Sequence, residues 1–192
     1  MRAFIAIPID RERTWMLEAV LKRLQQQKWS DQVRWFLPKN FHITLHFLGA
    51  NVPKSKITQV MNMMDSHLAT EVSGFGIELD QVELFPSQQA PHTLIVSVRN
   101  NAGLQRLFES VESQLYSLGL EGKKRKFRPH ISLGRIQTGA AAPDIRIPQN
   151  LAAVKLSLSV EKIVLFESEL TRGAPIYTPL KVVTLPSQTS HI

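Results

Sequence analysis

Cysteine is missing from this sequence of 192 residues. Its absence excludes disulfide bonds, thiolate metal sites and a cysteine nucleophile, and it is compatible with a reducing compartment. The sequence also lacks any apolar run near the roughly 18 residues that cross a bilayer. The apolar run after Met1 is too short for a signal peptide. We therefore expect a cytoplasmic protein with no membrane partner.

Acidic residues are outnumbered by basic ones, 16 Asp and Glu against 23 Lys and Arg, so the formal net charge is +7. This excess favours polyanionic partners such as RNA or nucleotides, although many basic proteins bind neither. Hydrophobic residues make up 43% of the chain, enough for a packed core. The length fits a single domain, which we place at residues 1–185, with residues 186–192 as a flexible tail. We expect a monomer.

The hydrophobic pattern predicts short strands alternating with amphipathic helices, which indicates an α+β protein. The predicted strands cover residues 2–9, 41–48, 75–85, 93–98, 131–133, 156–166 and 176–185. The predicted helices cover residues 11–24, 53–68 and 102–118. Gly119 follows the last helix at the position where a terminating glycine belongs.

A unit of strand, helix and histidine-bearing strand occurs twice. Phe4 precedes His42 by 38 residues, and Leu94 precedes His130 by 36. Two such halves, packed face to face, would bring both histidines into one cleft. We therefore expect two pseudo-symmetric lobes, each a small, mainly antiparallel sheet with outer helices, on either side of a central cleft. Strand–helix–strand units are common, so the local motifs carry more of this argument than the spacing does.

The first motif, residues 41–49, reads Phe-His-Ile-Thr-Leu-His-Phe-Leu-Gly. Alternate residues of a strand share a face. The apolar members alternate and are expected to face the core: Phe41, Ile43, Leu45 and Phe47. The polar members are expected to face a wet cleft: His42, Thr44 and His46.

The second motif, residues 128–135, reads Arg-Pro-His-Ile-Ser-Leu-Gly-Arg, and it places His130 and Ser132 on one face. The pattern of histidine, any residue, and threonine or serine is therefore present twice. Imidazole exchanges a proton near neutral pH, and a hydroxyl two residues later on the same face can bond a phosphate oxygen. Two copies supply an acid, a base and two phosphate anchors, so this chemistry needs no metal ion.

The two motifs resemble the paired His-x-Thr-x signatures of the two-histidine phosphoesterases. Within that group the chain is similar to the RNA 2′,3′-cyclic phosphodiesterases, also called 2′-5′ RNA ligases. The resemblance runs over about residues 2–185 and includes Arg-Ala-Phe-Ile-Ala-Ile at the start, Leu-Phe-Glu-Ser at 165–168, Gly173, and Tyr-Thr-Pro-Leu at 177–180. Ser132 departs from the usual threonine but keeps the hydroxyl.

The resemblance implies hydrolysis of 2′,3′-cyclic phosphates at RNA or tRNA ends to 2′-phosphates, without a cofactor, and reversible 2′-5′ ligation. It implies that His42 donates a proton and that His130 accepts one; the residues alone give the pair without the roles. Thr44 and Ser132 would bind the phosphate. The resemblance also places Arg135 at the phosphate, which requires a bend at Gly134, because strict alternation puts Arg135 on the face opposite His130.

Three alternatives remain open. The same chemistry could act on 2′,5′-oligonucleotides or cyclic ADP-ribose derivatives. His42, His46 and His130 could instead hold a metal ion in a metal-dependent hydrolase. A non-catalytic RNA-binding module would suit the net charge but would leave the paired motifs unexplained. Two features also have two interpretations: the basic run at residues 123–128 is a solvated loop or an RNA-steering segment, and Trp35 is a core or base-stacking residue.

Overall fold

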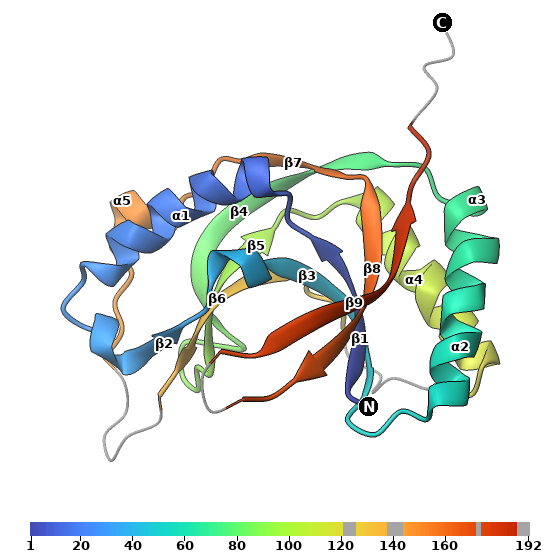
Figure 1. The fold of residues 1–192 in the computed structure, drawn as a ribbon. Coiled ribbons are helices and arrows are strands. Elements are labelled where there is room, and N and C mark those ends of the chain that lie inside the picture. Colours follow the sequence, from blue (N-terminus) through green and yellow to red (C-terminus); the bar gives the residue numbers. More distant parts are fainter. Residues whose placement is uncertain (121–125, 138–143, 172–173, 188–192) are drawn as a thin grey trace, which may run out of the picture.

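The protein is built on one curved nine-stranded sheet with helices at both of its ends (Figure 1). The computed structural model describes residues 1–120, 126–137, 144–171 and 174–187. The strands are β1 (Ala3–Pro8), β2 (Val33–Trp35), β3 (His42–Gly49), β4 (Phe75–Phe85), β5 (Thr93–Val98), β6 (His130–Ile136), β7 (Ser157–Val160), β8 (Lys162–Glu169) and β9 (Ile176–Thr184). The helices are α1 (Arg11–Gln25), α2 (Lys54–Met63), α3 (Ala69–Glu71), α4 (Ala102–Ser117) and α5 (Gln149–Ala152). Single turns of other helix types are η1 (Ser30–Gln32), η2 (Pro38–Asn40) and η3 (Met64–Leu68).

The strand order is β7-β4-β5-β6-β3-β1-β8-β9, with β2 also paired to β6. At the centre of the sheet, β3 pairs with β6 through Ile43 and Ile131. The α+β class is confirmed, but the expectation of two lobes with separate sheets is wrong. Each histidine-bearing strand would otherwise expose an unpaired edge, and pairing the two edges satisfies backbone groups that an open cleft would leave bare.

The internal repeat is present in the strand pairing. In the first half β1 pairs antiparallel with β3, with Ile7 opposite Ile43. In the second half β5 pairs antiparallel with β6, with Val96 opposite Ile131. The outer neighbours match as well, because β8 lies beside β1 and β4 lies beside β5. Each histidine therefore occupies the same position in its half, one residue before the isoleucine that joins the halves.

The predicted strand over residues 156–166 is wrong, because the chain forms two strands there. β7 pairs with β4 in the second half, whereas β8 pairs with β1 in the first half. Val160 and Ile163 are both buried, so the apolar pattern continues across the break. The break falls at exposed Glu161, whose carbonyl accepts a hydrogen bond from the Leu185 amide at 2.8 Å.

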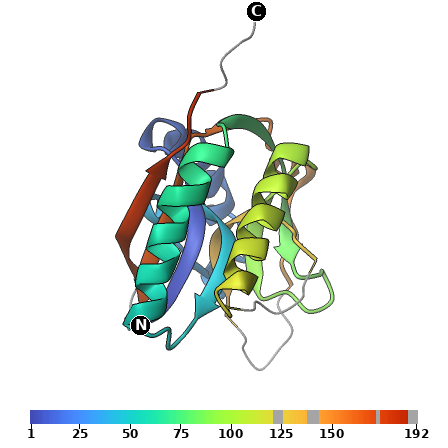
Figure 2. The ribbon, with the colours of Figure 1, turned by 90° about the vertical axis from the view of Figure 1, so that its right-hand side faces the viewer.

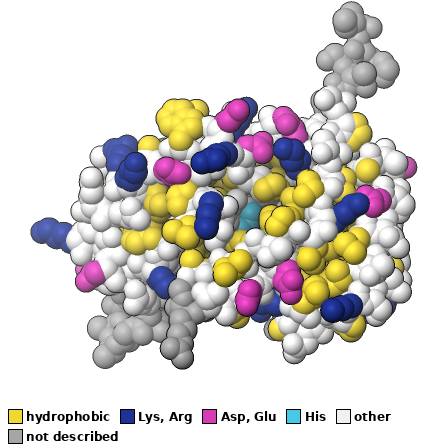
Figure 3. All heavy atoms as spheres, in the orientation of Figure 1, with side chains coloured by type: hydrophobic (Ala, Val, Ile, Leu, Met, Phe, Trp, Pro, Cys, Tyr) yellow, Lys and Arg dark blue, Asp and Glu magenta, His cyan; other side chains and the backbone are white. Residues whose placement is uncertain are grey.

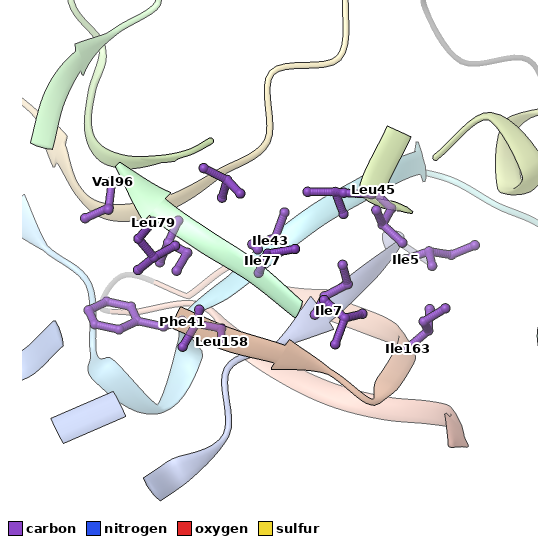
Figure 4. Close-up of a cluster of buried hydrophobic side chains, with 14 of the residues drawn as sticks. Ile5, Ile7, Phe41, Ile43, Leu45, Ile77, Leu79, Val96, Leu158 and Ile163 are labelled. Carbon is purple, nitrogen blue, oxygen red and sulfur yellow. The ribbon is translucent and has the colours of Figure 1, made fainter. Parts of the chain in front are cut away.

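The core lies between strands that face one another across the curved sheet. Ile5 and Ile7 of β1 belong to the same buried cluster as Ile77 of β4 and Leu158 of β7 (Figure 4). These strands are far apart in the strand order, so the sheet must curve to bring them together. Burial of this cluster fixes which face of β3 and β6 is left for the site.

The helices gather in two groups. α1 and α5 lie at one end of the sheet, and α2, α3 and α4 lie at the other (Figures 1 and 2). The side chain of Asn101 caps α4 by accepting a hydrogen bond from the Leu104 amide at 2.9 Å. Gly119 ends this helix with φ of +68°, as predicted, because glycine adopts that conformation without strain. In the described part of the chain, no helix is long and apolar enough to span a bilayer.

The predicted flexible tail at residues 186–192 begins at a residue that is attached to the fold. The Pro186 carbonyl accepts a hydrogen bond from the Gly74 amide at 2.8 Å, so the backbone at this point is still attached to the folded part. Residues 188–192 of the predicted tail lie outside the described residues.

Candidate active site

His42 is the first residue of β3 and packs against aromatic side chains. Its ring centroid lies 5.0 Å from that of Phe4 and 5.4 Å from that of Tyr177. Its Nδ1 lies 2.7 Å from the carbonyl oxygen of Asn40; a carbonyl only accepts, so Nδ1 carries the hydrogen. Its Nε2 lies 3.1 Å from Thr44 Oγ1, whose hydroxyl donates to it while the imidazole is neutral. Nε2 is therefore the atom that can exchange a proton with a substrate.

His130 is the first residue of β6 and is held in the same way. Its ring centroid lies 4.6 Å from that of Phe85. Its Nδ1 donates a hydrogen bond to the carbonyl oxygen of Arg128 at 2.7 Å, which again leaves Nε2 to exchange a proton. In both motifs the tautomer is set by the carbonyl two residues earlier. Among the described residues no hydrogen bond joins Ser132 to His130, so this hydroxyl is available to a ligand.

The pairing of β3 with β6 brings the two motifs together. Extending the register by one residue in each direction places Thr44 opposite His130 and His42 opposite Ser132. The four side chains share the face opposite the core, because the central isoleucine of each motif is fully buried. Diagonal neighbours in such a pair of strands lie about 7–8 Å apart. The two imidazoles occupy one diagonal, so one phosphate group fits between them.

A register shift in β3 turns His46 away from this face. The pairing with β1 changes between Thr44 and His46, so strict alternation breaks at Leu45. His46 is only 8% exposed, stacks on Phe108 of α4 at 4.5 Å, and places Nε2 3.3 Å from that residue's carbonyl oxygen. Phe47 is 46% exposed instead. The expectation that Phe47 faces the core is wrong. His46 is buried against α4, and it contributes to the wall of a pocket that Thr44 and His130 also line.

The histidines of the proposed metal site have different neighbours. His46 stacks on Phe108 of α4, whereas His42 packs against Phe4 and His130 packs against Phe85. Within the described ranges, no three His, Asp or Glu side chains gather closely enough to hold a metal ion. The geometry of the site thus rests on two imidazoles and two hydroxyls.

β6 carries a matching register shift, and it places Arg135 on the face of the site. The pairing with β5 changes between Ser132 and Gly134. Leu133 and Gly134 are both buried, and Arg135 is exposed. This is the bend that the resemblance required. A side chain at Gly134 would not fit, since a Cβ there would lie 2.5 Å from Val33 Cγ1 of β2.

Burial lowers the pKa of both motif histidines, because an apolar environment penalises the imidazolium form. The charge of His130 lowers the pKa of His42 further. For His130, Arg128 acts in the same direction as burial and Glu83 opposes it. The hydrogen bonds to the two carbonyls oppose the shift in both cases. Both imidazoles are therefore mostly neutral at neutral pH in the free protein.

A pocket of about 540 Å³ opens beside Thr44 and His130. Lys126 and Arg128 add positive charge to its lining, and Glu112 adds one negative charge. Its wall is aromatic: Phe47, Phe85, Phe108 and Phe127. The space-filling view shows histidine surface within a hollow near the centre of one face, among hydrophobic and basic side chains (Figure 3). A second hollow of about 640 Å³ has acidic residues in its lining and contains neither histidine.

Trp35 and the basic run at residues 123–128 each had two interpretations from the sequence. Trp35 is half-buried, and its Nε1 donates to the backbone and side-chain oxygens of Ser30 at 3.2 Å, so its polar edge is occupied within the fold. Residues 123–125 of the basic run lie outside the described residues. The guanidinium of Arg128 lies 4.8 Å from the centre of the Phe85 ring.

The aromatic partners of the two histidines were not anticipated from the sequence. The sequence places Phe4 only in the first predicted strand, and Phe85 only at the end of another strand. The available signal was the repeat itself. Phe166 lies opposite Phe4, and Phe85 lies opposite Thr93, at matching positions of the two halves. Phe85 contacts His130 directly, whereas Phe166 stacks on Phe4, which in turn contacts His42.

Comparisons with known proteins identify the family of this chain. A family model described as the 2′-5′ RNA ligase superfamily matches residues 13–172. The chain belongs to this superfamily. A relative from Aeropyrum pernix, described as an RNA 2′,3′-cyclic phosphodiesterase, is 34% identical over 152 residues, covering 78% of this chain and 84% of the relative. A relative from Thermotoga maritima with the same description is 27% identical over 185 residues, covering 94% of this chain and 93% of the relative.

Solved structures similar to this superfamily member have the same fold. The structure of TT0787 from Thermus thermophilus has a TM-score of 0.82 at 25% identity, covering 98% of this chain and all of that chain. The structure of E. coli LigT complexed with 3′-AMP has a TM-score of 0.78 at 26% identity, covering 96% of this chain and 97% of that chain. The α+β class and the family predicted from the two motifs are therefore confirmed.

Proposed function

We propose that this superfamily member is an RNA 2′,3′-cyclic phosphodiesterase that uses His42 and His130 as an acid–base pair. The observation that carries the proposal is the matched presentation of two imidazoles. Each offers Nε2 to the same face, each has Nδ1–H bound to the carbonyl two residues earlier, and the two lie diagonally across the β3–β6 pair. An acid and a base on opposite sides of one phosphorus are what an in-line displacement needs.

The reaction follows from this placement. His130 Nε2 takes a proton from water, and the water oxygen attacks phosphorus. The bond from phosphorus to O3′ breaks, and His42 supplies the proton to O3′. The products are a 2′-phosphate and a free 3′-hydroxyl, and the assignment of His42 to O3′ comes from the family resemblance. Thr44 and Ser132 bind the non-bridging oxygens, and Arg135 adds a positive charge to the developing dianion.

His42 must be protonated to act as the acid, although burial lowers its pKa in the free protein. The substrate raises this pKa, because a phosphate anion within a few ångströms of the ring favours the imidazolium form. Binding of the cyclic phosphate thus favours protonation of His42. His130 is already neutral, as a base must be.

The aromatic pocket supports a nucleotide substrate. Nucleobases stack on aromatic side chains with little regard to sequence, and basic residues in the lining suit the phosphate backbone. The E. coli relative was crystallised with 3′-AMP. Ligation needs an RNA 5′-hydroxyl in place of water. His130 deprotonates this hydroxyl, its oxygen attacks phosphorus, the bond from phosphorus to O3′ breaks, and His42 protonates O3′, which leaves a 2′-5′ linkage.

The test is incubation with an oligoribonucleotide ending in a 2′,3′-cyclic phosphate, followed by a phosphatase that removes only 3′-phosphates. The expected product resists this phosphatase, because its phosphate is on O2′. Release of inorganic phosphate would show that O2′ had departed and would overturn the assignment of His42. Prior dialysis against a chelator should leave turnover unchanged; a loss that zinc restores would overturn the acid–base mechanism. A parallel incubation with 2′,5′-oligonucleotides and cyclic ADP-ribose derivatives tests the related substrates.

A further inference from the structure

Two arginines face the same side of the sheet on neighbouring strands. Arg34 of β2 lies directly opposite Arg135 of β6 in an antiparallel register. The next pair along, Val33 and Ile136, is buried, so the arginines are on the exposed face. Both arginine side chains are exposed. The two guanidinium groups are therefore held on strands that neighbour one another, with solvent in front of them.

No acidic group among the described residues neutralises this pair. Neither Arg34 nor Arg135 forms an ion pair or side-chain hydrogen bond with any residue in the described part of the chain. Some other arginines form ion pairs: Arg99 pairs with Glu78 and Asp80, and Arg128 pairs with Glu83. Like charges directly opposite in a sheet are destabilising. Such a pair is favourable once an anion lies between the two guanidinium groups, because each presents a planar fork that matches phosphate oxygens.

The pair lies beside the proposed catalytic site. The register shift in β6 places Arg135 on the same face as Ser132, three residues along the strand and so about 10 Å away. Arg34 lies on the neighbouring strand β2, whose backbone is about 4.8 Å from that of β6. A phosphate anchored by Ser132 therefore has Arg135 within side-chain reach, and Arg34 lies beyond it. This distance suits a second phosphate on the same RNA chain.

We infer that Arg34 and Arg135 form a second phosphate subsite, which binds the phosphodiester on the 5′ side of the terminal nucleotide. Arg135 has five N–H donors and bridges the reacting phosphate and this phosphodiester; Arg34 contacts the phosphodiester alone. The subsite makes the protein select polynucleotide ends over nucleoside 2′,3′-cyclic phosphates. This inference rests on the proposed function, because it takes the reacting phosphate to lie between the two histidines.

The test compares cytidine 2′,3′-cyclic phosphate with a dinucleotide that ends in the same cyclic nucleotide. The wild-type protein should have the higher kcat/KM for the dinucleotide. Arg34→Gln should lower the ratio of dinucleotide to mononucleotide kcat/KM by about 10- to 100-fold, the size expected for one charge-assisted hydrogen bond. Arg34→Lys should fall between, because lysine keeps the charge and loses the fork. The matched control is Arg106→Gln, on the exposed face of α4, which should leave the ratio unchanged.

An unchanged ratio in Arg34→Gln, or equal losses on both substrates, would overturn the inference. A second arm does not depend on turnover: binding of a dinucleotide with a 3′-terminal phosphate, titrated over a salt series. Arg34→Gln should lower the slope of log affinity against log salt by about 0.7, the value for one phosphate contact on a single strand. If the wild-type protein hydrolysed neither substrate, the proposed function would fail, and this binding slope would still decide whether the subsite exists.

Discussion

The two halves of the molecule present the same motif in different surroundings. His42 is covered by Phe4 and Tyr177, and its Nε2 is already bonded to Thr44. His130 touches Phe85, has Arg128 and Glu83 nearby, and opens onto the aromatic pocket. The hydrogen bond that fixes the tautomer is the same in both, at 2.7 Å. The motif therefore supplies two equivalent imidazoles, and the surroundings make them differ.

The difference extends to the end of each motif. The two register shifts fall at equivalent positions, so His46 corresponds to Gly134 and Phe47 corresponds to Arg135. One half thus ends in an exposed aromatic ring, with the Arg2 guanidinium 4.4 Å from its centre, and the other ends in an exposed cation. A symmetric scaffold with unlike ends suits an asymmetric ligand, with an aromatic surface for a base on one side and positive charge for phosphate on the other.

Removal of either histidine tests whether both halves are needed. His42→Ala and His130→Ala should each lower kcat by about 10² to 10⁴, the usual contribution of one acid or base. This corresponds to roughly 3–5 kcal/mol of activation free energy. Groups that act in one displacement are not additive, so the double variant should lose less than the product of the two single losses. The measurement is single-turnover hydrolysis of a cyclic-phosphate oligonucleotide.

The control is His92→Ala, because His92 is exposed and its side chain has no place in either motif. It should keep wild-type kcat. A folded His42→Ala or His130→Ala variant with near wild-type turnover would show that one half is dispensable for the chemistry.

Removal of the two hydroxyls, by Ser132→Ala and Thr44→Ala, should lower kcat/KM to different extents. Ser132→Ala removes a phosphate contact, and a hydrogen bond to a charged group contributes about 1.5–3 kcal/mol, or roughly 10- to 100-fold in kcat/KM. Thr44→Ala removes a similar contact and also the bond to His42, so its loss should be the larger. Ser132→Thr should be close to wild type, since the hydroxyl is kept. Equal losses in the two alanine variants would mean that the Thr44–His42 bond has no role in turnover.

Much of this molecule could be predicted from the sequence, because local patterns determine it. Alternation in β3 and β6 identified the faces around Ile43 and Ile131, and the repeat placed one histidine in each half. The sequence also showed that Arg135 needed a bend at Gly134, since that conclusion follows from counting residues along a strand.

Long-range pairing decided the features that the sequence did not predict. No local pattern shows that β3 and β6 pair with each other. Two lobes with separate sheets were therefore expected, whereas the structure has one continuous sheet. The shift that buries His46 depends on the partner strand β1 and on Phe108 of α4, both distant in sequence. The run at 156–166 is apolar throughout, and only its two partner strands show that it is two strands.

Gly134 and His46 occupy equivalent positions at the two register shifts, so a substitution at Gly134 tests whether this position in the second half needs a glycine. Gly134→Ala would place a Cβ 2.5 Å from Val33 Cγ1 and 3.1 Å from the Arg34 carbonyl oxygen. Overpacking of this kind typically costs about 1–3 kcal/mol of unfolding free energy. Urea unfolding measures it, and Gly76→Ala is the control, since a Cβ at Gly76 meets nothing within 4 Å. Equal stability of the two variants would mean that β2 moves aside at no cost.

The pH dependence of turnover tests how the environments of His42 and His130 differ. Of the predicted effects it is the smallest. Burial lowers the pKa of both histidines from the ordinary value of about 6.5. Turnover needs one imidazole charged and the other neutral, a state most populated between the two pKa values. The maximum of kcat/KM, which reports the free protein, should therefore lie below pH 6.5 and fall as pH rises. The kcat maximum should lie at higher pH, because bound phosphate favours imidazolium and raises both pKa values.

Glu83→Gln then distinguishes the halves, since Glu83 raises the pKa of His130 and does not act on His42. Removing its charge should move one limb of the kcat/KM profile to lower pH and leave the other in place. The loss of the Glu83–Arg128 ion pair, at 3.7 Å, acts in the same direction by leaving the Arg128 charge uncompensated. The measurement is kcat/KM from pH 4.5 to 8.5 (about two units on either side of the ordinary histidine value) for both proteins. Movement of both limbs together would mean that the two imidazoles titrate as one coupled unit, and that their surroundings do not set them apart.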